Sequence, residues 1–343
     1  EWEWRDSAGY SLPTAPPGVH LIYNLASKQD ISNSRIAFFA EDALYLTTKA
    51  AYLTLNGGLR FSYWSMNKEF LVSPRVNLSI SPLNFNRWNY RVAVGLYYQS
   101  PFYKEYRQAL IDDYGNSVVQ LNRNIKSPRS LQFIVGADYE FRMFNRPFKL
   151  TGEAYYKALS NLISYEYDNL KVSYSGINDS KGHIMGLDFK LFGQFVPGSD
   201  SWLTFSLMNT SQKLNGKSVP LPSDQRYSVA LYFTDYFPKF PKLKFSLRGV
   251  ISDGLTMTAP RVSYKRVDIG LSYQFVGAPS DGVRPYNFWR HFKSIVLGVD
   301  CFNLFDISNV SSYYWVTDVN DIQYAVPNYL TRRQFNVRLA LEF

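Results

Sequence analysis

Long hydrophobic runs are missing from this chain of 343 residues. A helix that spans a membrane needs about 18 or more consecutive apolar residues, and the sequence contains no such run. Cysteine is also scarce, because Cys301 stands alone, which excludes internal disulfides and most cysteine-based metal sites. If the chain enters a membrane, it must do so as a closed sheet whose backbone groups are all paired.

Signals for catalysis and metal binding are scarce as well. The histidines are His20, His183 and His291, and none has a second His, Cys or carboxylate at metal-ligand spacing. The G-x-S-x-G nucleophile elbow and the glycine patterns that hold phosphates or dinucleotides do not occur. We therefore expect no enzyme and no cofactor, although His183 would be the candidate base if a triad were assembled in space.

The formal net charge of +9 is not concentrated anywhere along the chain. Lys and Arg stand singly among expected strands and turns, whereas proteins that bind nucleic acid gather basic residues in a helix or patch. No nucleic-acid partner is expected. A mildly basic aqueous interior and loops that face anionic surface lipid explain the charge more simply.

Alternation of apolar and polar residues is the dominant pattern that is present. In the last ten residues, Phe335, Val337, Leu339, Leu341 and Phe343 fall on one side of a period-2 strand, and polar or small residues fall on the other. Aromatic residues make up 17% of the chain and stand at both ends of well-formed apolar rows. This pattern predicts a wall between lipid and water, with aromatic girdles at the two membrane interfaces.

Fourteen strands can be assigned from the alternation. They are expected near residues 18–25, 34–44, 51–65, 72–82, 88–100, 129–142, 147–166, 181–196, 201–212, 225–236, 242–253, 264–276, 293–316 and 322–343. Val94, Phe133 and Leu271 belong to the outward apolar rows, whereas Ala93 and Arg91 face inward. The fold class is therefore an all-β, transmembrane antiparallel barrel.

The connections between these strands alternate between short and long. Short turns are expected at residues 47–49, 83–87, 144–146, 197–200 and 238–241, and long loops at 101–128, 167–180, 213–224, 254–263 and 305–321. Transmembrane barrels have short periplasmic turns and longer extracellular loops, and every short turn here falls at the end where Phe343 lies. The stretch from Gly277 to Phe292 is the exception, and it suits either an interfacial turn or a short helix.

Several short motifs occur in an order that resembles the barrel of TonB-dependent receptors, especially large receptors of Bacteroidetes outer membranes. They are L-N-G-G-L-R-F-S-Y-W-S from Leu55 to Ser65, S-P-R-V from Ser73 to Val76, V-G-L-Y-Y-Q-S-P from Val94 to Pro101, G-E-A-Y-Y-K from Gly152 to Lys157, N-L-F-D from Asn303 to Asp306 and the terminal Phe343. The resemblance implies a 22-stranded barrel of the bacterial cell outer membrane, closed by a plug and powered through TonB. Such a receptor imports a scarce nutrient such as a siderophore, vitamin, glycan or peptide.

The chain departs from that pattern, because it has room for about fourteen strands and shows neither a plug domain nor a TonB-binding segment. We expect residues 1–343 to be the C-terminal portion of a receptor barrel, with the plug domain absent. A complete passive channel of fourteen strands stays open as an alternative, as does a soluble all-β binding protein. The expected partners are the TonB complex through the missing plug, outer-membrane lipid and lipopolysaccharide, and the barrel-assembly machinery through the C-terminal strand with Phe343.

Inward-facing charges form the first group of candidate site residues. They are Arg60, Arg75, Arg91, Asp138, Glu153, Lys157, Arg266, Asp268, Arg338 and Glu342. Charges on a polar inner wall can pair across strands and stabilise it. They can equally contact a plug or guide an anionic solute, and the sequence leaves both interpretations open.

Aromatic residues of the long loops form the second group. The segment 101–114 is aromatic and charged, and it places Tyr103 and Tyr106 where an extracellular ligand could bind. Tyr314 and Trp315 could stack on a sugar or a hydrophobic ligand in the same way. Tyr and Trp near a membrane interface also serve as anchors, so this interpretation competes with ligand contact.

Overall fold

The computed structural model describes residues 2–12, 18–29, 31–111, 117–168, 171–196, 199–214, 216–237, 240–256, 261–277, 291–318 and 322–343. Nearly all regular structure in these ranges is β-strand, beside one 3-10 turn, η1 (Tyr103–Tyr106). None of the described segments forms a helix with the length and apolar character needed to cross a membrane.

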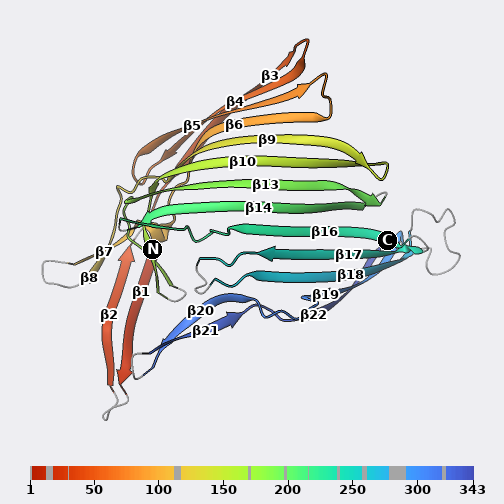
Figure 1. Cartoon of the computed structure of the whole chain (residues 1–343). Coiled ribbons are helices and arrows are strands. Elements are labelled where there is room, and N and C mark those ends of the chain that lie inside the picture. The colour runs from red at the N-terminus through yellow and green to blue at the C-terminus, as the bar shows by residue number, and fades with distance from the viewer. Residues whose placement is uncertain are drawn as a thin grey trace.

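One large antiparallel sheet dominates the molecule (Figure 1). In spatial order its strands are β3 (Arg35–Thr47), β4 (Ala51–Trp64), β5 (Glu69–Pro82), β6 (Trp88–Tyr98), β9 (Arg129–Met143), β10 (Arg146–Leu162), β13 (Ser180–Val196), β14 (Ser199–Leu214), β16 (Tyr227–Phe237), β17 (Phe240–Ser252), β18 (Tyr264–Val276), β19 (Ser294–Phe302) and β22 (Gln334–Glu342). The short β15 (Lys217–Val219) pairs with β14 and brings the sheet to fourteen strands. We call this sheet the wall.

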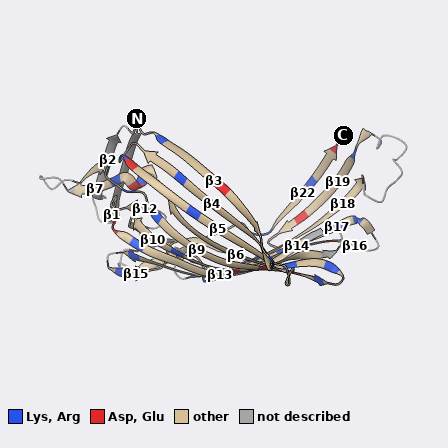
Figure 2. Cartoon of the chain, turned by 90° about the horizontal axis from the view of Figure 1, so that it is seen from above, with Lys and Arg blue, Asp and Glu red and all other residues tan. Residues whose placement is uncertain are grey.

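The wall bends into an open trough when it is seen from above (Figure 2). Its two edges are β3 and β22, each of which has one neighbour in the wall within the described residues. Because each of the thirteen long strands is antiparallel to the next, β3 and β22 run in the same direction. Both end on the side of the wall where the C-terminus lies.

Within the described residues, four two-stranded hairpins lie outside the wall. They are β1 (Trp2–Leu12) with β2 (Gly18–Gln29), β7 (Arg107–Ile111) with β8 (Ser117–Leu121), β11 (Tyr165–Asp168) with β12 (Lys171–Tyr174), and β20 (Val310–Thr317) with β21 (Gln323–Tyr329). The expected first wall strand, at 18–25, was therefore placed wrongly, because β2 pairs with β1 instead. A period-2 pattern identifies a strand, but it does not identify the strand's partner.

The last two expected strands also need correction. Residues 293–316 and 322–343 each divide into one wall strand and one strand of the β20–β21 hairpin. In the first stretch, a turn separates β19 from β20, and in it Asn303 and Asp306 adopt positive φ angles of 51° and 53°. Asn and Asp tolerate this left-handed conformation better than other residues with a side chain, and it ends β19.

The connections alternate in length much as the sequence predicts. Short turns join β3 to β4, β5 to β6, β9 to β10, β13 to β14 and β16 to β17 at the end where the chain stops, which we call the turn end. Long connections gather at the opposite end, the loop end (Figure 1). One short turn, at residues 65–68, also lies at the loop end. Of the exceptional stretch from Gly277 to Phe292, residues 278–290 lie outside the described residues.

The register of the strands confirms the predicted facing. Val94 lies opposite Val76 on β5 and opposite Phe133 on β9, and residues that pair across strands share a face of the sheet. The same register places Ala93 on the other face. The apolar residues of this face are not packed into a core, since Phe133 and Leu271, on interior strands of the wall, are 43% and 44% exposed. The wall therefore has one continuous apolar face, which we call the outer face, and one polar inner face.

A small hydrophobic core lies at the loop end. Its buried members are Trp64, Tyr106, Ile125 and Ile163. They come from the end of β4, from η1 and from the connections that follow β8 and β10. This core packs the long loops against the wall and thereby sets the shape of the inner face beneath them.

Candidate functional site

The charges around Arg91 form a closed network on the inner face. Arg91 on β6 donates hydrogen bonds to Asp138 on β9 and, at 2.8 Å, to Glu153 on β10. Asp138 is 2% exposed, and it also accepts a hydrogen bond of 2.8 Å from the hydroxyl of Thr151. The ammonium of Lys149 lies 3.1 Å from the same carboxylate. Every charge in this group has a partner, as expected of a structural clamp across three strands.

Arg266 and Asp268 form a second closed group near the end of β19. The Nε of Arg266 donates to Asp268 at 2.7 Å, and the same carboxylate oxygen accepts the backbone N–H of Asn303 at 2.8 Å. Arg266 also lies over the ring of Phe302, with 5.5 Å between the guanidinium carbon and the ring centroid. These contacts hold the turn that ends the strand.

A third arrangement differs, because its cations outnumber its carboxylates. Arg35, Arg60 and Arg75 line a hollow of about 480 Å³ together with Trp64 and Tyr97. We call these five residues the basic hollow. Arg60 and Arg75 are among the candidate site residues that the sequence predicts on the inner face. Arg35, Trp64 and Tyr97 are not among those candidates. A strand's first arginine carries no local signal that marks it as part of a site.

The remaining inward candidates do not join these groups through any contact within the described residues. The ammonium of Lys157 lies 5.3 Å from the ring centroid of its neighbour Tyr155. Arg338 on β22 lies opposite Gly298 on β19. Glu342, at the turn end, lies 4.0 Å from the ammonium of Lys293.

The aromatic candidates of the first long loop occupy two different environments. Tyr106 is 2% exposed, its ring centroid lies 5.4 Å from that of Trp64, and its hydroxyl donates to the carbonyl of Pro101 at 2.6 Å. Burial raises the pKa of Tyr106 above its ordinary value. This ring belongs to the core under the loop rather than to its surface. Tyr103 is exposed, and residues 112–114 of the expected segment lie outside the described residues.

Tyr314 and Trp315 are exposed on the β20–β21 hairpin. Tyr314 lies opposite Val326 and Trp315 lies opposite Ala325. Successive side chains of a strand point to opposite faces, so the two rings cannot form one continuous stacking surface. Each ring would have to contact a ligand from its own side of the hairpin.

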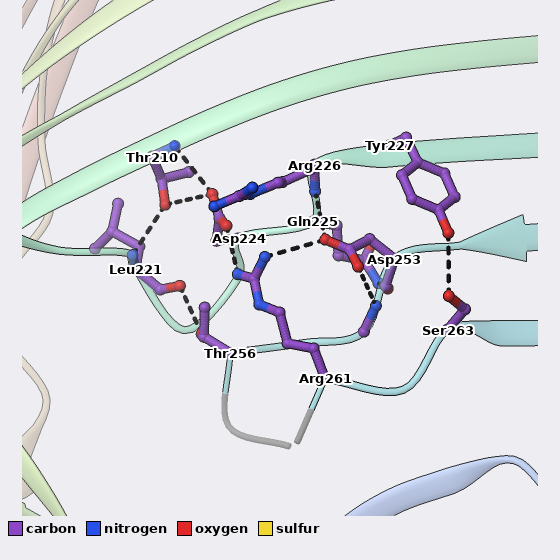
Figure 3. Close-up of polar contacts among 11 residues, drawn as sticks. Thr210, Leu221, Asp224, Gln225, Arg226, Tyr227, Asp253, Thr256, Arg261 and Ser263 are labelled. Atoms are coloured by element: carbon purple, nitrogen blue, oxygen red, sulfur yellow. Dashed lines mark hydrogen bonds and ion pairs between the residues drawn. The ribbon is translucent and has the colours of Figure 1, made fainter. Parts of the chain in front are cut away.

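Two long loops are tied together by an ion-pair cluster that sequence reasoning did not find (Figure 3). Asp224 accepts hydrogen bonds from the backbone N–H and hydroxyl of Thr210, at 3.0 and 2.8 Å, and from Arg261 at 2.5 Å. Arg261 also donates to Asp253 at 3.0 Å. Burial raises the pKa of Asp224, but the hydrogen bonds from Arg261 and Thr210 outweigh it and lower the pKa below its ordinary value. Asp224 and Arg261 are 37 residues apart in sequence, too far for a local pattern to connect them.

The residues that could bind a metal ion are dispersed in the described part of the chain. No group of three or more His, Cys, Asp or Glu side chains there could hold a metal ion. His183 stacks on Tyr156, with 6.0 Å between the ring centroids. Its strand register places it opposite Ser211, on the outer face of the wall near the loop end.

A family model described as TonB dependent receptor-like, beta-barrel, matches residues 2–304 of the chain. The chain belongs to this family. The apolar outer face is accordingly the lipid-facing side of an outer-membrane β-barrel. A soluble all-β binding protein does not agree with this assignment. No curated protein matches the sequence.

Solved structures of receptor barrels resemble the fold of this barrel region. The outer membrane transporter YddB from Escherichia coli has a TM-score of 0.62 and 12% identity, and the match covers 95% of this chain and 48% of that one. A ferric enterobactin receptor mutant from Pseudomonas aeruginosa has a TM-score of 0.61 and 16% identity, with 92% and 45% covered. The pyoverdine receptor FpvA of Pseudomonas aeruginosa has a TM-score of 0.55 and 12% identity, with 95% and 44% covered.

The receptor-barrel chain thus spans about half the length of these structures. At such low identity the likeness establishes the fold alone. Ligand specificity must be argued from the side chains of this chain. The basic hollow and the exposed loop aromatics are described features that a solute could contact.

Proposed function

We propose that this chain is the C-terminal barrel region of a TonB-dependent outer-membrane transporter that imports a scarce nutrient. The observation that carries the proposal is the division of the wall into a continuous apolar outer face and a charged inner face, with the long loops gathered at one end. The family match and the structures named as a transporter and as receptors support it. The wall would line the route of the nutrient, and the loops would capture it.

The direction of the two edge strands favours a larger barrel over a complete channel of fourteen strands. If β3 paired directly with β22, the two strands would be parallel, because both run toward the turn end. Bacterial single-chain barrels have an even number of antiparallel strands. An odd number of further strands between β3 and β22 restores that rule, and nine would complete the barrel of 22 strands that the family resemblance implies.

The partners belong to the same proposal. A plug domain would fill the interior, contact the inner face and couple the barrel to the TonB complex. The C-terminal strand with Phe343 would be recognised by the barrel-assembly machinery. Phe343 is exposed, and its ring centroid lies 4.8 Å from that of Phe292.

Outward-facing cations at the loop end support lipopolysaccharide as a lipid partner. Arg129, Lys213 and Lys265 are exposed, and their register places them on the same face as the apolar rows. Anionic headgroups of the outer leaflet would meet this line of charge, whereas the acyl chains would cover the apolar rows below it.

Growth of a deletion strain tests the transport proposal. Loss of the protein should impair growth on one scarce iron, vitamin or glycan source and leave growth on rich medium unchanged. Deletion of TonB in the otherwise wild-type strain should abolish uptake of the same nutrient. Uptake that continues without TonB would favour the passive channel, and wild-type growth of the deletion strain on every source would contradict import of those nutrients.

A further inference from the structure

The three arginines of the basic hollow form a descending series on the inner face. Arg35 opens β3 at the loop end, opposite Trp64 at the end of β4. Arg60 lies on β4 four residues before Trp64, and therefore closer to the turn end. Arg75 lies opposite Gly58, which is two residues closer still to the turn end. At the rise of a β-strand, the series spans about 20 Å of the wall, from the loops toward the middle of the barrel.

Few carboxylates balance these cations. Arg75 donates to Glu41 on β3 at 3.0 Å, and both side chains are partly exposed. Glu69 faces the same side at the loop end, but its carboxylate accepts hydrogen bonds from Ser127 at 2.6 and 3.0 Å and ties a loop to β5. Arg60 makes no ion pair within the described residues. The hollow therefore keeps positive charge that its own walls do not neutralise.

Arg35 does not reduce this excess either. Its guanidinium donates to the carbonyl of Pro101 at 3.4 Å and to the hydroxyl of Tyr106 at 3.2 Å, and both acceptors are neutral. It also lies over the ring of Trp64, 5.3 Å from the centroid. These contacts orient the side chain, and no carboxylate of the described residues pairs with its charge.

Two buried donors of the basic hollow have no acceptor among the residues that the structure describes. They are the Nε1 of Trp64 and the Nε of Arg75, and Trp64 as a whole is 1% exposed. A buried donor that is left without an acceptor destabilises the folded protein. Such groups in a native protein call for an explanation, and an acceptor supplied by a ligand is one.

Tyr97 adds an aromatic surface next to these donors. Gly95 lies opposite Arg75, and a Cβ built on Gly95 would lie 2.7 Å from the ring of Tyr97. The absence of a side chain at Gly95 therefore allows the ring to lie flat against the inner face. A planar group bound there could stack on Tyr97 while its oxygen atoms reach the guanidinium of Arg75.

We propose that the basic hollow binds a small organic anion, one whose oxygen atoms accept hydrogen bonds and whose planar ring stacks on Tyr97. This inference rests on the proposed function in nutrient uptake and names the chemical class of solute that the inner face receives below the loops. Uncharged sugars and cationic peptides do not match the excess of guanidinium groups.

Two dyes with the same fused ring system and opposite charge test the proposal. Fluorescein carries negative charge and rhodamine 6G positive charge, and fluorescence anisotropy measures their binding to the protein purified from outer membranes in detergent. Fluorescein should bind more tightly than rhodamine 6G, and added salt should weaken its binding. Equal affinity for the two dyes, or no binding of fluorescein, would overturn the proposal.

Variants locate the binding on the wall. Arg60→Gln should weaken fluorescein binding about tenfold, because the variant loses a charge-assisted hydrogen bond to the anion. Trp64→Phe should weaken it less, because an aromatic ring stays while the orphan donor and the five-membered part of the indole are lost. Arg129→Gln on the outer face is the matched control and should bind as the wild type does. If the folded Arg60→Gln variant retained full affinity for fluorescein, the hollow would not be the binding site. The same would follow if Arg129→Gln weakened fluorescein binding as much as Arg60→Gln.

Failure of this inference can be distinguished from failure of the proposed function. Deletion of TonB should abolish nutrient uptake in cells, whereas fluorescein binding is measured on the purified protein and does not depend on TonB. Wild-type nutrient uptake by the Arg60→Gln variant, with unchanged fluorescein affinity, would reject the anion site and leave the transporter proposal standing. Charge-selective binding by a protein that imports nothing would support the site and reject the transporter.

Discussion

The Arg91 network and the basic hollow lie on the same inner face, yet their arginines are held in opposite ways. Arg91 reaches two carboxylates, and one of them, Asp138, is almost fully buried. Arg60 reaches none within the described residues, and Arg75 reaches only Glu41. A charge on the wall of a channel is structural when the wall itself completes its pairing, and it is available to a solute when the wall does not. The position of a charge along its strand also affects whether a solute can reach it, since the basic hollow lies under the loops, where a solute would enter.

The largest expected effect tests whether both groups face the interior at all. Arginine at Val94 should cost about 2–4 kcal/mol if the site lies near the middle of the bilayer, because the outer face contacts hydrocarbon. Arginine at Ala93, the adjacent inward residue, should cause a smaller loss of stability. Leu339 and Ala340 form a second matched pair on β22. Folding into lipid vesicles measures both pairs, and equal penalties within a pair would contradict the assignment of faces.

A smaller effect separates the two arginine groups directly. Arg91→Ala should destabilise the barrel by about 2 kcal/mol, because Asp138 stays buried with fewer partners and Arg91 itself is only partly buried. Arg60→Ala should change stability by less than about 0.5 kcal/mol, since it removes no ion pair. Urea unfolding in lipid vesicles gives both values. Similar losses from the two variants would remove the distinction between a structural and an available charge.

Tyr106 connects the basic hollow to the small hydrophobic core at the loop end, and its hydroxyl should make a modest contribution to the stability of the protein. Tyr106→Phe keeps the packing on Trp64 but removes the hydrogen bonds to Pro101 and from Arg35. We expect a loss of about 1 kcal/mol and a loosening of Arg35. Hydrogen exchange of the backbone near residues 101–106 should speed up relative to wild type, whereas exchange in β9 should not change. Unchanged exchange near η1 would mean that the hydroxyl does not hold the loop.

The smallest expected effect concerns a closed pair in an exposed loop. Arg332 donates two hydrogen bonds to Asp306, at 2.9 and 3.1 Å, and these lower the pKa of Asp306 to about 2. A carboxyl whose pKa is lower in the folded protein stabilises it above the ordinary pKa, near 3.8, and loses that contribution as the pH falls through about 2. Proteolysis of the loop after β19 by an acid-stable protease should therefore accelerate between pH 4 and 2. Arg332→Ala should remove this pH dependence, and an equal acceleration in the variant would reject the role of the pair.

Local alternation predicted most of the wall. All but the first of the fourteen expected strands lie wholly or partly in the main sheet, because every strand with hydrocarbon on one side and water on the other must alternate in polarity. The same argument located Arg60, Arg75 and Arg91 on the inner face. It could not distinguish them, since the distinction depends on Asp138 and Glu153, which lie 47 and 62 residues from Arg91 in sequence.

The sequence by itself therefore determined the strands, their two faces and the alternation of turns and loops, because each of these follows from the solvent that a residue and its immediate neighbours contact. Only the tertiary structure decided which cations are neutralised. It also decided that β2 lies outside the wall and that the edge strands β3 and β22 point in the same direction. Those features depend on which strands become neighbours and in which register, and pairing between residues far apart in sequence leaves no local periodicity to read.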